Sequence, residues 1–161
     1  MNFLQYYNHP KNFRYKSFEF ALLEAKKRNL KTFVETGVAR GKQKFLFFSK
    51  INWKDGMSTL IFSDYVKHVK GSLTSCDISK KNINNAKNFT KKNEQFINFV
   101  VNDSIKFLSE LNKSIDFLYL DSLDGQFEGA SKHQLEEIKV AKKCLHKKSL
   151  VLLDDKGNKT N

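Results

Sequence analysis

The ten residues from Thr32 to Gly41, TFVETGVARG, decide the fold of this chain. An apolar run ends at a carboxylate, Glu35, and a turn that contains Gly37 and Gly41 follows at once. A strand that runs into such a turn lets main-chain amides approach a ligand closely, because glycine has no side chain in the way. The carboxylate favours a ligand with a cationic or hydroxyl-rich face over a pyrophosphate. We therefore interpret this stretch as the first strand of a ligand-binding α/β domain.

Four later segments repeat the design of an apolar run that ends at an acid, and helical patterns separate them. We predict strands at 30–35, 71–77, 96–103, 115–121 and 149–154, and helices at 15–29, 60–69, 81–91, 105–111 and 128–145. The last helix is expected to place four apolar side chains inward, those of Leu135, Ile138, Ala141 and Leu145. The aromatic segment 44–50 is interpreted as either an extra strand or a packed loop. Strands that alternate with helices indicate a parallel sheet, and continuous apolar strands fit a sheet covered on both faces.

The length of 161 residues, with 40% hydrophobic and 13% aromatic residues, predicts a single domain over 1–161. Within it we expect an N-terminal helical segment, 1–29, and a βα core, 30–161. No apolar run reaches the roughly 18 residues that a membrane span needs, and the N-terminus lacks the pattern of a signal peptide. Cys76 and Cys144 have neither disulfide nor metal spacing. We therefore expect a reduced, cytoplasmic protein without a membrane partner.

The formal net charge is +12, from 29 basic and 17 acidic residues. Such an excess is typical of proteins that bind nucleic acid or other anions. Nearly all the basic residues are scattered Lys, however, and arginine occurs only as Arg14, Arg28 and Arg40. Proteins that read phosphates and grooves usually favour arginine. A solvated, lysine-rich surface is therefore the favoured interpretation, and nucleic-acid binding stays open as the disfavoured one.

Each predicted strand ends at an acid, and the five acids are Glu35, Asp77, Asp103, Asp121 and Asp154. In an open α/β sheet, ligands bind beyond the carboxyl ends of the strands, so all five acids are expected to line one rim. Converging carboxylates repel one another, so such a rim would hold a cation, a metal or many hydroxyl donors. Capping of the following helix is the alternative role for each single acid.

In this order of motifs the chain resembles the class I S-adenosylmethionine (SAM)-dependent methyltransferases, over roughly residues 32–155. VETG at 34–37 is similar to the first motif of the family, although Ala39 stands where a middle glycine is common, and GMST at 56–59 is a second candidate for completing that motif. Three later segments resemble the later motifs of the family: SCDI at 75–78, VNDS at 101–104 and FLYLD at 117–121. The resemblance implies a three-layer Rossmann-like α/β sandwich with a mainly parallel sheet of order 3-2-1-4-5 and helices on both faces. The resemblance also implies two further strands after the fifth, and we expect either a shortened version of the fold, a fragment of it, or another subunit that covers the fifth strand.

The resemblance also implies SAM as the cofactor. Asp77 would accept hydrogen bonds from the ribose hydroxyls, Asp103 would accept one from an exocyclic amine, and Glu35 would help to fix the amino-acid end. The predicted cofactor-binding set is Glu35, Thr36, Gly37, Gly41, Ser58, Asp77, Ile78, Asp103, Ser104 and Asp121, and the predicted catalytic residues are Asp121 and Asp124. Methyl transfer is an in-line displacement, in which positioning can supply most of the acceleration.

The acids after the last two strands are similar to those of the metal-dependent, catechol O-methyltransferase-like branch of the family. That likeness implies Mg²⁺ held by Asp121, Asp154 and Asp155, where it would lower the pKa of the acceptor hydroxyl. Asp124 stands where that branch tends to carry a basic catalytic residue. The alternative is a solvated turn at 154–155, with Asp121 as a capping or amine-binding acid.

The expected function is SAM-dependent methyl transfer to an oxygen of a small molecule or sugar. The alternative is a domain that kept the fold and lost the chemistry, and that associates with nucleic acid through its basic surface. A nucleotide-binding oxidoreductase is disfavoured because the first turn lacks the Gly-x-Gly-x-x-Gly pattern. The fifth strand would leave an exposed apolar edge, so we also expect a homodimer through that edge.

Overall fold

The computed structural model describes residues 1–45, 48–123, 125 and 127–154, and for 42–45 and 48–50 it describes the main chain only. Its centre is a five-stranded parallel sheet with the order β5-β4-β1-β6-β7. The strands are β1 (Thr32–Thr36), β4 (Ser72–Asp77), β5 (Ile97–Val101), β6 (Ile115–Leu120) and β7 (Leu145–Leu153). This is the predicted order 3-2-1-4-5, so the predicted Rossmann-like α/β fold is confirmed.

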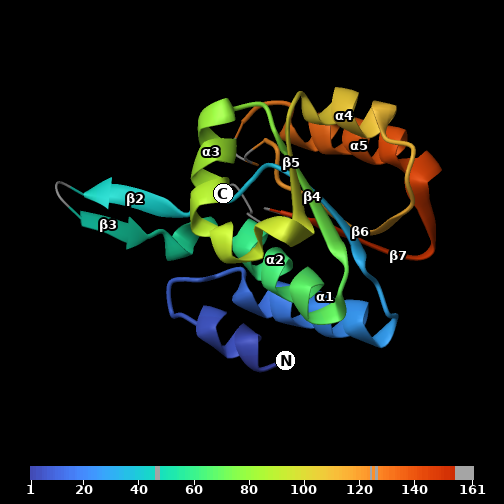
Figure 1. Cartoon of the computed structure of the whole chain (residues 1–161). Helices are drawn as coiled ribbons and strands as arrows, with labels where there is room; N and C mark the ends of the chain where they lie inside the picture. Colours follow the sequence, from blue (N-terminus) through green and yellow to red (C-terminus); the bar gives the residue numbers. More distant parts are fainter. Residues whose placement is uncertain (46–47, 124, 126, 155–161) are drawn as a thin grey trace, which may run out of the picture.

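Helices cover both faces of this sheet (Figure 1). The helices are α1 (Tyr15–Lys27), α2 (Ser58–Val69), α3 (Lys80–Phe89), α4 (Ser104–Glu110) and α5 (Ala130–Ala141). Short 3-10 helices occupy Asn2–Tyr7, Trp53–Asp55, Lys91–Phe96 and Lys142–Cys144. Helices α1 and α2 pack on one face, and α4 and α5 pack on the opposite one. The three predicted layers are therefore present.

Aromatic side chains form much of the largest of the three hydrophobic core clusters of the described residues. Phe33 on β1 stacks on Phe117 of β6, with ring centroids 4.4 Å apart. Phe62 of α2 meets both rings, and Phe18 of α1 meets Phe62 at 5.3 Å. Because adjacent parallel strands carry these rings in register, the aromatic stack ties β1 to β6 at the centre of the sheet.

The aromatic segment predicted as a strand or a loop belongs to a hairpin outside the main sheet. Strands β2 (Lys42–Phe45) and β3 (Phe48–Ile51) pair antiparallel and project from the body of the domain (Figure 1). The hairpin leaves the domain directly after the turn that follows β1. It therefore lies on the side of the molecule where the strands of the sheet end.

The last predicted helix, 128–145, needs two corrections. It ends as α5 at Ala141, and Leu145 begins β7, where it pairs with Ile115. The prediction that Leu135 faces the core is wrong, because its side chain is 49% exposed, whereas Gln134 and Glu137 are buried. The reason is that α5 packs one polar stripe against the loops at the strand ends, where main-chain and hydroxyl groups offer hydrogen bonds.

Strand β7 forms one edge of the sheet and pairs only with β6 among the described strands. Its register shifts after the first pair: Ile115 pairs with Leu145, but Phe117, two residues on, pairs with Leu150, five residues on. Val151 on this edge is 40% exposed. The edge therefore stays the predicted surface for a homodimer. Within the described residues, no helix combines the length and apolar character that crossing a membrane requires.

Candidate cofactor site

The turn after β1 lies between the ends of its two neighbouring strands. The Gly37 N–H donates to the Cys76 main-chain oxygen at the end of β4 (2.8 Å). On the other side, a Cβ at Gly37 would lie 2.0 Å from the main-chain oxygen of Asp121, just after β6. The φ of Gly37 is +80°, a left-handed value that favours glycine. Only glycine fits here, so Gly37 of the first motif is required by packing.

The rest of this turn is held by the start of α2. The Ala39 N–H donates to Thr59 Oγ1 at 2.9 Å. Gly41, at φ +70°, closes the turn, and a Cβ there would lie 2.1 Å from the ring of Phe89. These contacts fix the path of the main chain from 37 to 41 before any ligand arrives, which is the condition for amides to bind one without rearrangement.

Glu35 is buried beneath this turn and organises it. Its side chain is fully buried, and three hydroxyls donate to it: Ser58 (2.5 Å), Thr59 (2.9 Å) and Ser75 (2.8 Å). The prediction that Glu35 lines an open rim is therefore wrong. Ser58, also predicted to contact the cofactor, is 1% exposed and serves Glu35 instead. The carboxylate lies at the N-terminus of α2, where the helix dipole favours a negative charge.

Burial raises the pKa of Glu35 to about 7, against the pull of its three hydroxyl donors. The folded protein therefore holds this proton at a pH where the unfolded chain, with a pKa of 4.5, has released it. Protonated Glu35 therefore contributes to the free energy of unfolding. This contribution is complete below pH 4.5 and is lost as the pH rises through about 7.

We expect Glu35→Gln to remove this pH dependence. The three hydroxyls can rotate to satisfy a neutral amide. Between about pH 4.5 and 7, the free energy of unfolding should fall by about 3 kcal/mol more for the natural protein than for the variant. Urea unfolding of both proteins at pH 5 and pH 8 measures the difference. Parallel pH profiles would show that Glu35 does not carry the proton.

Asp77 stands at the end of β4, next to the turn. Its carboxylate accepts from the main-chain N–H groups of Val38 (3.2 Å) and Ser79 (2.7 Å) and from Nδ2 of Asn82 (3.3 Å). It is half-buried, and the next side chain, Ile78, is 74% exposed. A fixed carboxylate beside an exposed apolar surface offers a hydroxyl acceptor and a stacking face at one place.

The end of β5 supplies the next pair of predicted residues. Asp103 caps α4 by accepting from the Lys106 N–H (2.8 Å), and its side chain stays exposed. Because the Asp103 side chain is exposed, it can cap α4 and still accept a hydrogen bond from a ligand, as predicted. Ser104 is buried, and its Oγ lies 3.0 Å from Nε2 of His133 on α5. Ser104 therefore ties α4 to α5 behind the rim.

Asp121 follows β6 and completes the centre of the rim. Its N–H donates to the main-chain oxygen of Thr36 (2.8 Å), and Tyr119 donates its hydroxyl to Oδ2 at 3.3 Å. Burial, together with the charge of the neighbouring Asp154, raises the pKa of Asp121 well above its usual range. Thr36 is fully buried beside it, and its hydroxyl has no hydrogen-bond partner among the described residues.

Asp154, after β7, is buried and paired with an arginine. Arg14 Nε donates to Oδ1 at 2.5 Å, and Nη2 of the same guanidinium donates to Oδ2. Although burial opposes it, this ion pair lowers the pKa of Asp154. The predicted acids at 77, 103, 121 and 154 thus lie at the strand ends, but Asp154 is already paired with the guanidinium of Arg14.

The described residues do not fit the predicted magnesium site. Both oxygens of Asp154 accept from Arg14, and no group of three His, Cys, Asp or Glu side chains in the described ranges is arranged to hold a metal. Asp155 and Asp124 lie outside the described residues. Their predicted roles stay predictions.

A family model described as a methyltransferase domain matches residues 53–156. The chain belongs to this methyltransferase family. The match begins after the Gly37 turn, so it does not depend on VETG at 34–37. A sequence search against curated proteins finds no match.

Solved methyltransferases share the fold of this methyltransferase domain. The structure of a Staphylococcus aureus protein assigned as a caffeoyl-CoA O-methyltransferase superposes with a TM-score of 0.64 at 14% identity, over 95% of this chain and 69% of that one. A Podospora anserina methyltransferase bound to S-adenosylhomocysteine (SAH) gives 0.60 at 16%, over 94% and 59%. A Bacillus cereus O-methyltransferase in complex with SAH gives 0.53 at 17%, over 81% and 52%. The chain thus spans between about half and two thirds of these proteins.

Sequence reasoning missed two sets of residues in the methyltransferase domain. Arg14 was available as a signal, because arginine occurs at only three positions, but nothing local links it to Asp154. The second set is Ser122 and Glu137: Ser122 Oγ lies 3.0 Å from Nε2 of His133 and donates to the buried Glu137 (2.8 Å). The polar stripe of α5 was the available signal for this set.

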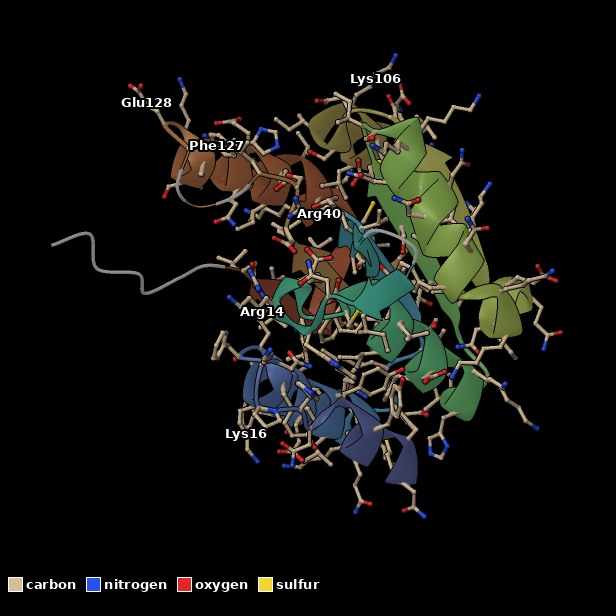
Figure 2. The ribbon with its side chains drawn as sticks, turned by 90° about the vertical axis from the view of Figure 1, so that its left-hand side faces the viewer. Arg14, Lys16, Arg40, Lys106, Phe127 and Glu128 are labelled. Carbon is tan, nitrogen blue, oxygen red and sulfur yellow. The ribbon has the colours of Figure 1, made fainter. Side chains whose placement is uncertain are left out.

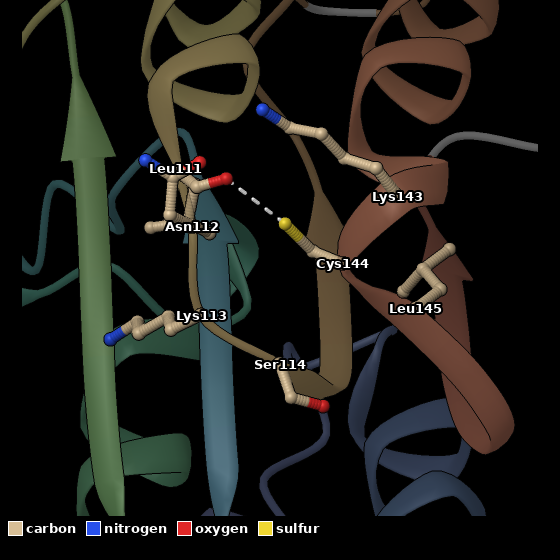
Figure 3. Close-up of a pocket in the computed structure, with 7 residues that line it drawn as sticks. All are labelled: Leu111, Asn112, Lys113, Ser114, Lys143, Cys144 and Leu145. Carbon is tan, nitrogen blue, oxygen red and sulfur yellow. Dashed lines mark hydrogen bonds between the residues drawn. The ribbon is translucent and has the colours of Figure 1, made fainter.

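A separate pocket lies at the opposite end of the sheet, where β6 and β7 begin (Figure 3). Its volume is about 320 Å³, and it is lined by Leu111, Asn112, Lys113, Ser114, Lys143, Cys144 and Leu145. The Cys144 thiol donates to the Leu111 main-chain oxygen (3.1 Å), and Lys113 donates to Thr74 Oγ1 (2.7 Å). The thiol and the ammonium group therefore each have a hydrogen-bond partner within the protein. The pocket is remote from the strand ends that carry the candidate site.

Proposed function

We propose that the chain binds SAM and transfers its methyl group to an oxygen of a small molecule or sugar. The observation that carries the proposal is the Asp77 carboxylate, which is held by the N–H of Val38 in the glycine turn while the residue stays only half-buried. In this arrangement the ribose hydroxyls donate to Asp77, the adenine lies against Ile78, and its amine donates to Asp103. The orphan Thr36 hydroxyl and the main-chain amides of the turn are available to the amino-acid end.

Asp121 is the proposed catalytic residue of the described chain. It lies where the Gly37 turn meets β6, beside the proposed cofactor. Because its pKa is raised, the ionised form of the Asp121 carboxyl is a stronger base than an ordinary aspartate, and in that form it can accept the proton of the acceptor hydroxyl as the methyl group is transferred. The sulfonium cation of SAM also suits an acidic rim. Likeness to solved proteins named as O-methyltransferases supports oxygen as the accepting atom.

Titration calorimetry of this chain with SAM and with SAH tests the proposal. We expect saturable binding of both with micromolar dissociation constants, together with protection from thermal unfolding. A well-folded chain that binds neither compound at millimolar concentration would contradict the proposal. Binding without turnover of SAM on any hydroxylated acceptor would favour the alternative, a binding domain that has lost its chemistry.

A further inference from the structure

The acidic rim contains a built-in cation, the guanidinium of Arg14. Two of its nitrogens donate to the two oxygens of Asp154, in the bidentate geometry that suits arginine and a carboxylate. Its third nitrogen, Nη1, donates to the main-chain oxygen of Lys54 at 2.9 Å. The Asp154 side chain is 7% exposed and that of Arg14 is 27% exposed, so the pair is largely screened from water.

Three distant parts of the chain build this ion pair. Arg14 occupies the N-cap position of α1, Lys54 lies in the 3-10 helix before α2, and Asp154 follows β7. Gly56 lies against the arginine stem, because a Cβ there would come within 2.7 Å of Arg14 Cδ. In the view onto the hairpin side of the domain, Arg14 lies between α1 and the hairpin (Figure 2).

The position of Arg14 matters because a divalent cation would need the same oxygens. A guanidinium keeps its charge at every working pH and has no lone pair with which to bind a metal. A metal ion at Asp154 would have to break two charge-assisted hydrogen bonds and would then lie beside a positive charge. The rim therefore has its counter-ion without a metal.

We propose that Arg14 takes the place of a divalent metal at this rim, supplying the fixed positive charge that holds Asp154 beside Asp121. Arg14 is a positioning residue, since it acts through Asp154. The catalytic consequence, that Arg14 helps to place the proposed base Asp121, rests on the proposed function. Cation binding by the chain alone tests the replacement itself, with neither cofactor nor acceptor present.

Mn²⁺ titration followed by electron paramagnetic resonance decides the proposal. We expect no saturable Mn²⁺ binding by the natural protein, and binding at least about tenfold tighter by Arg14→Gln, in which the carboxyl groups at 121 and 154 are released. The double variant Arg14→Gln with Asp154→Asn should lose the gained site. Arg28→Gln, which breaks an ion pair with Glu24 elsewhere on α1, is the matched control and should behave as the natural protein does.

Arg14→Met, which keeps an unbranched stem against Gly56 but carries no charge, should gain the same Mn²⁺ site and decides the proposal if the glutamine variant does not fold. Arg14→Lys tests the charge itself. An ammonium retains the charge, so this variant should also fail to bind Mn²⁺. Saturable binding by the natural protein, or by Arg14→Lys as tightly as by Arg14→Gln, would overturn the proposal. It would also be overturned if folded Arg14→Gln gained no site, because Arg14 would then be a structural tie only. None of these outcomes depends on whether SAH binds.

Discussion

Replacing Asp77 with Asn should weaken SAH binding at least about 100-fold, because two charge-assisted hydrogen bonds to the ribose are lost. An asparagine also presents an NH₂ group to donors that now meet a carboxylate, including the N–H groups of Val38 and Ser79. Calorimetric titration at constant pH measures the loss. The thermal unfolding temperature, recorded in parallel, shows whether the variant remains folded.

Asn82→Ala is the matched control for Asp77→Asn. It removes the side-chain donor to Asp77 but leaves the carboxylate and both main-chain donors in place. Affinity should therefore stay within about fivefold of the natural protein. Equal losses in the two variants would mean that the local turn, rather than the Asp77 charge, carries the binding. Natural affinity in Asp77→Asn would remove Asp77 from the site.

The second large effect is expected on stability, for Gly37→Ala. The new methyl group would lie 2.0 Å from the Asp121 main-chain oxygen and 2.5 Å from its carbonyl carbon, and these atoms lie just after the end of β6. Alanine must also adopt φ near +80°. Overpacking and left-handed strain together should lower the free energy of unfolding by about 4 kcal/mol. That is a large share of the roughly 5–15 kcal/mol that stabilises a typical domain.

Gly129→Ala separates the two contributions. Gly129 has a similar φ of +84°, but a Cβ there would meet nothing within 4 Å. Its substitution should therefore cost only the conformational strain, about 1–2 kcal/mol. Urea unfolding of both variants gives the difference, which reports the contact between the Gly37 turn and β6. If both variants lost the same stability, the close approach at Gly37 would not be the constraint that we infer.

The strands, the helices and the rim were accessible from the sequence because their determinants are local, whereas the sheet order 3-2-1-4-5 was implied by the resemblance to the methyltransferase family. Apolar runs of strand length, each followed by an acid and then by a helical pattern, predict parallel strands whose carboxyl ends meet at one rim. Asp77, Asp103 and Asp121 therefore lie at the predicted places. The glycine turn was also readable, since a left-handed φ at Gly37 is a property of a few consecutive residues.

The partners of the charged groups were decided by the tertiary structure alone. Glu35 follows the same local pattern as Asp77, yet hydroxyls 23, 24 and 40 residues away enclose it. Arg14 and Asp154 are 140 residues apart, and only the packing of α1 near the end of β7 brings them together. An apolar pattern states which face of an element is buried, because burial depends on that element's own side chains. Which donor meets a buried carboxylate depends on segments that become neighbours only once the sheet has formed.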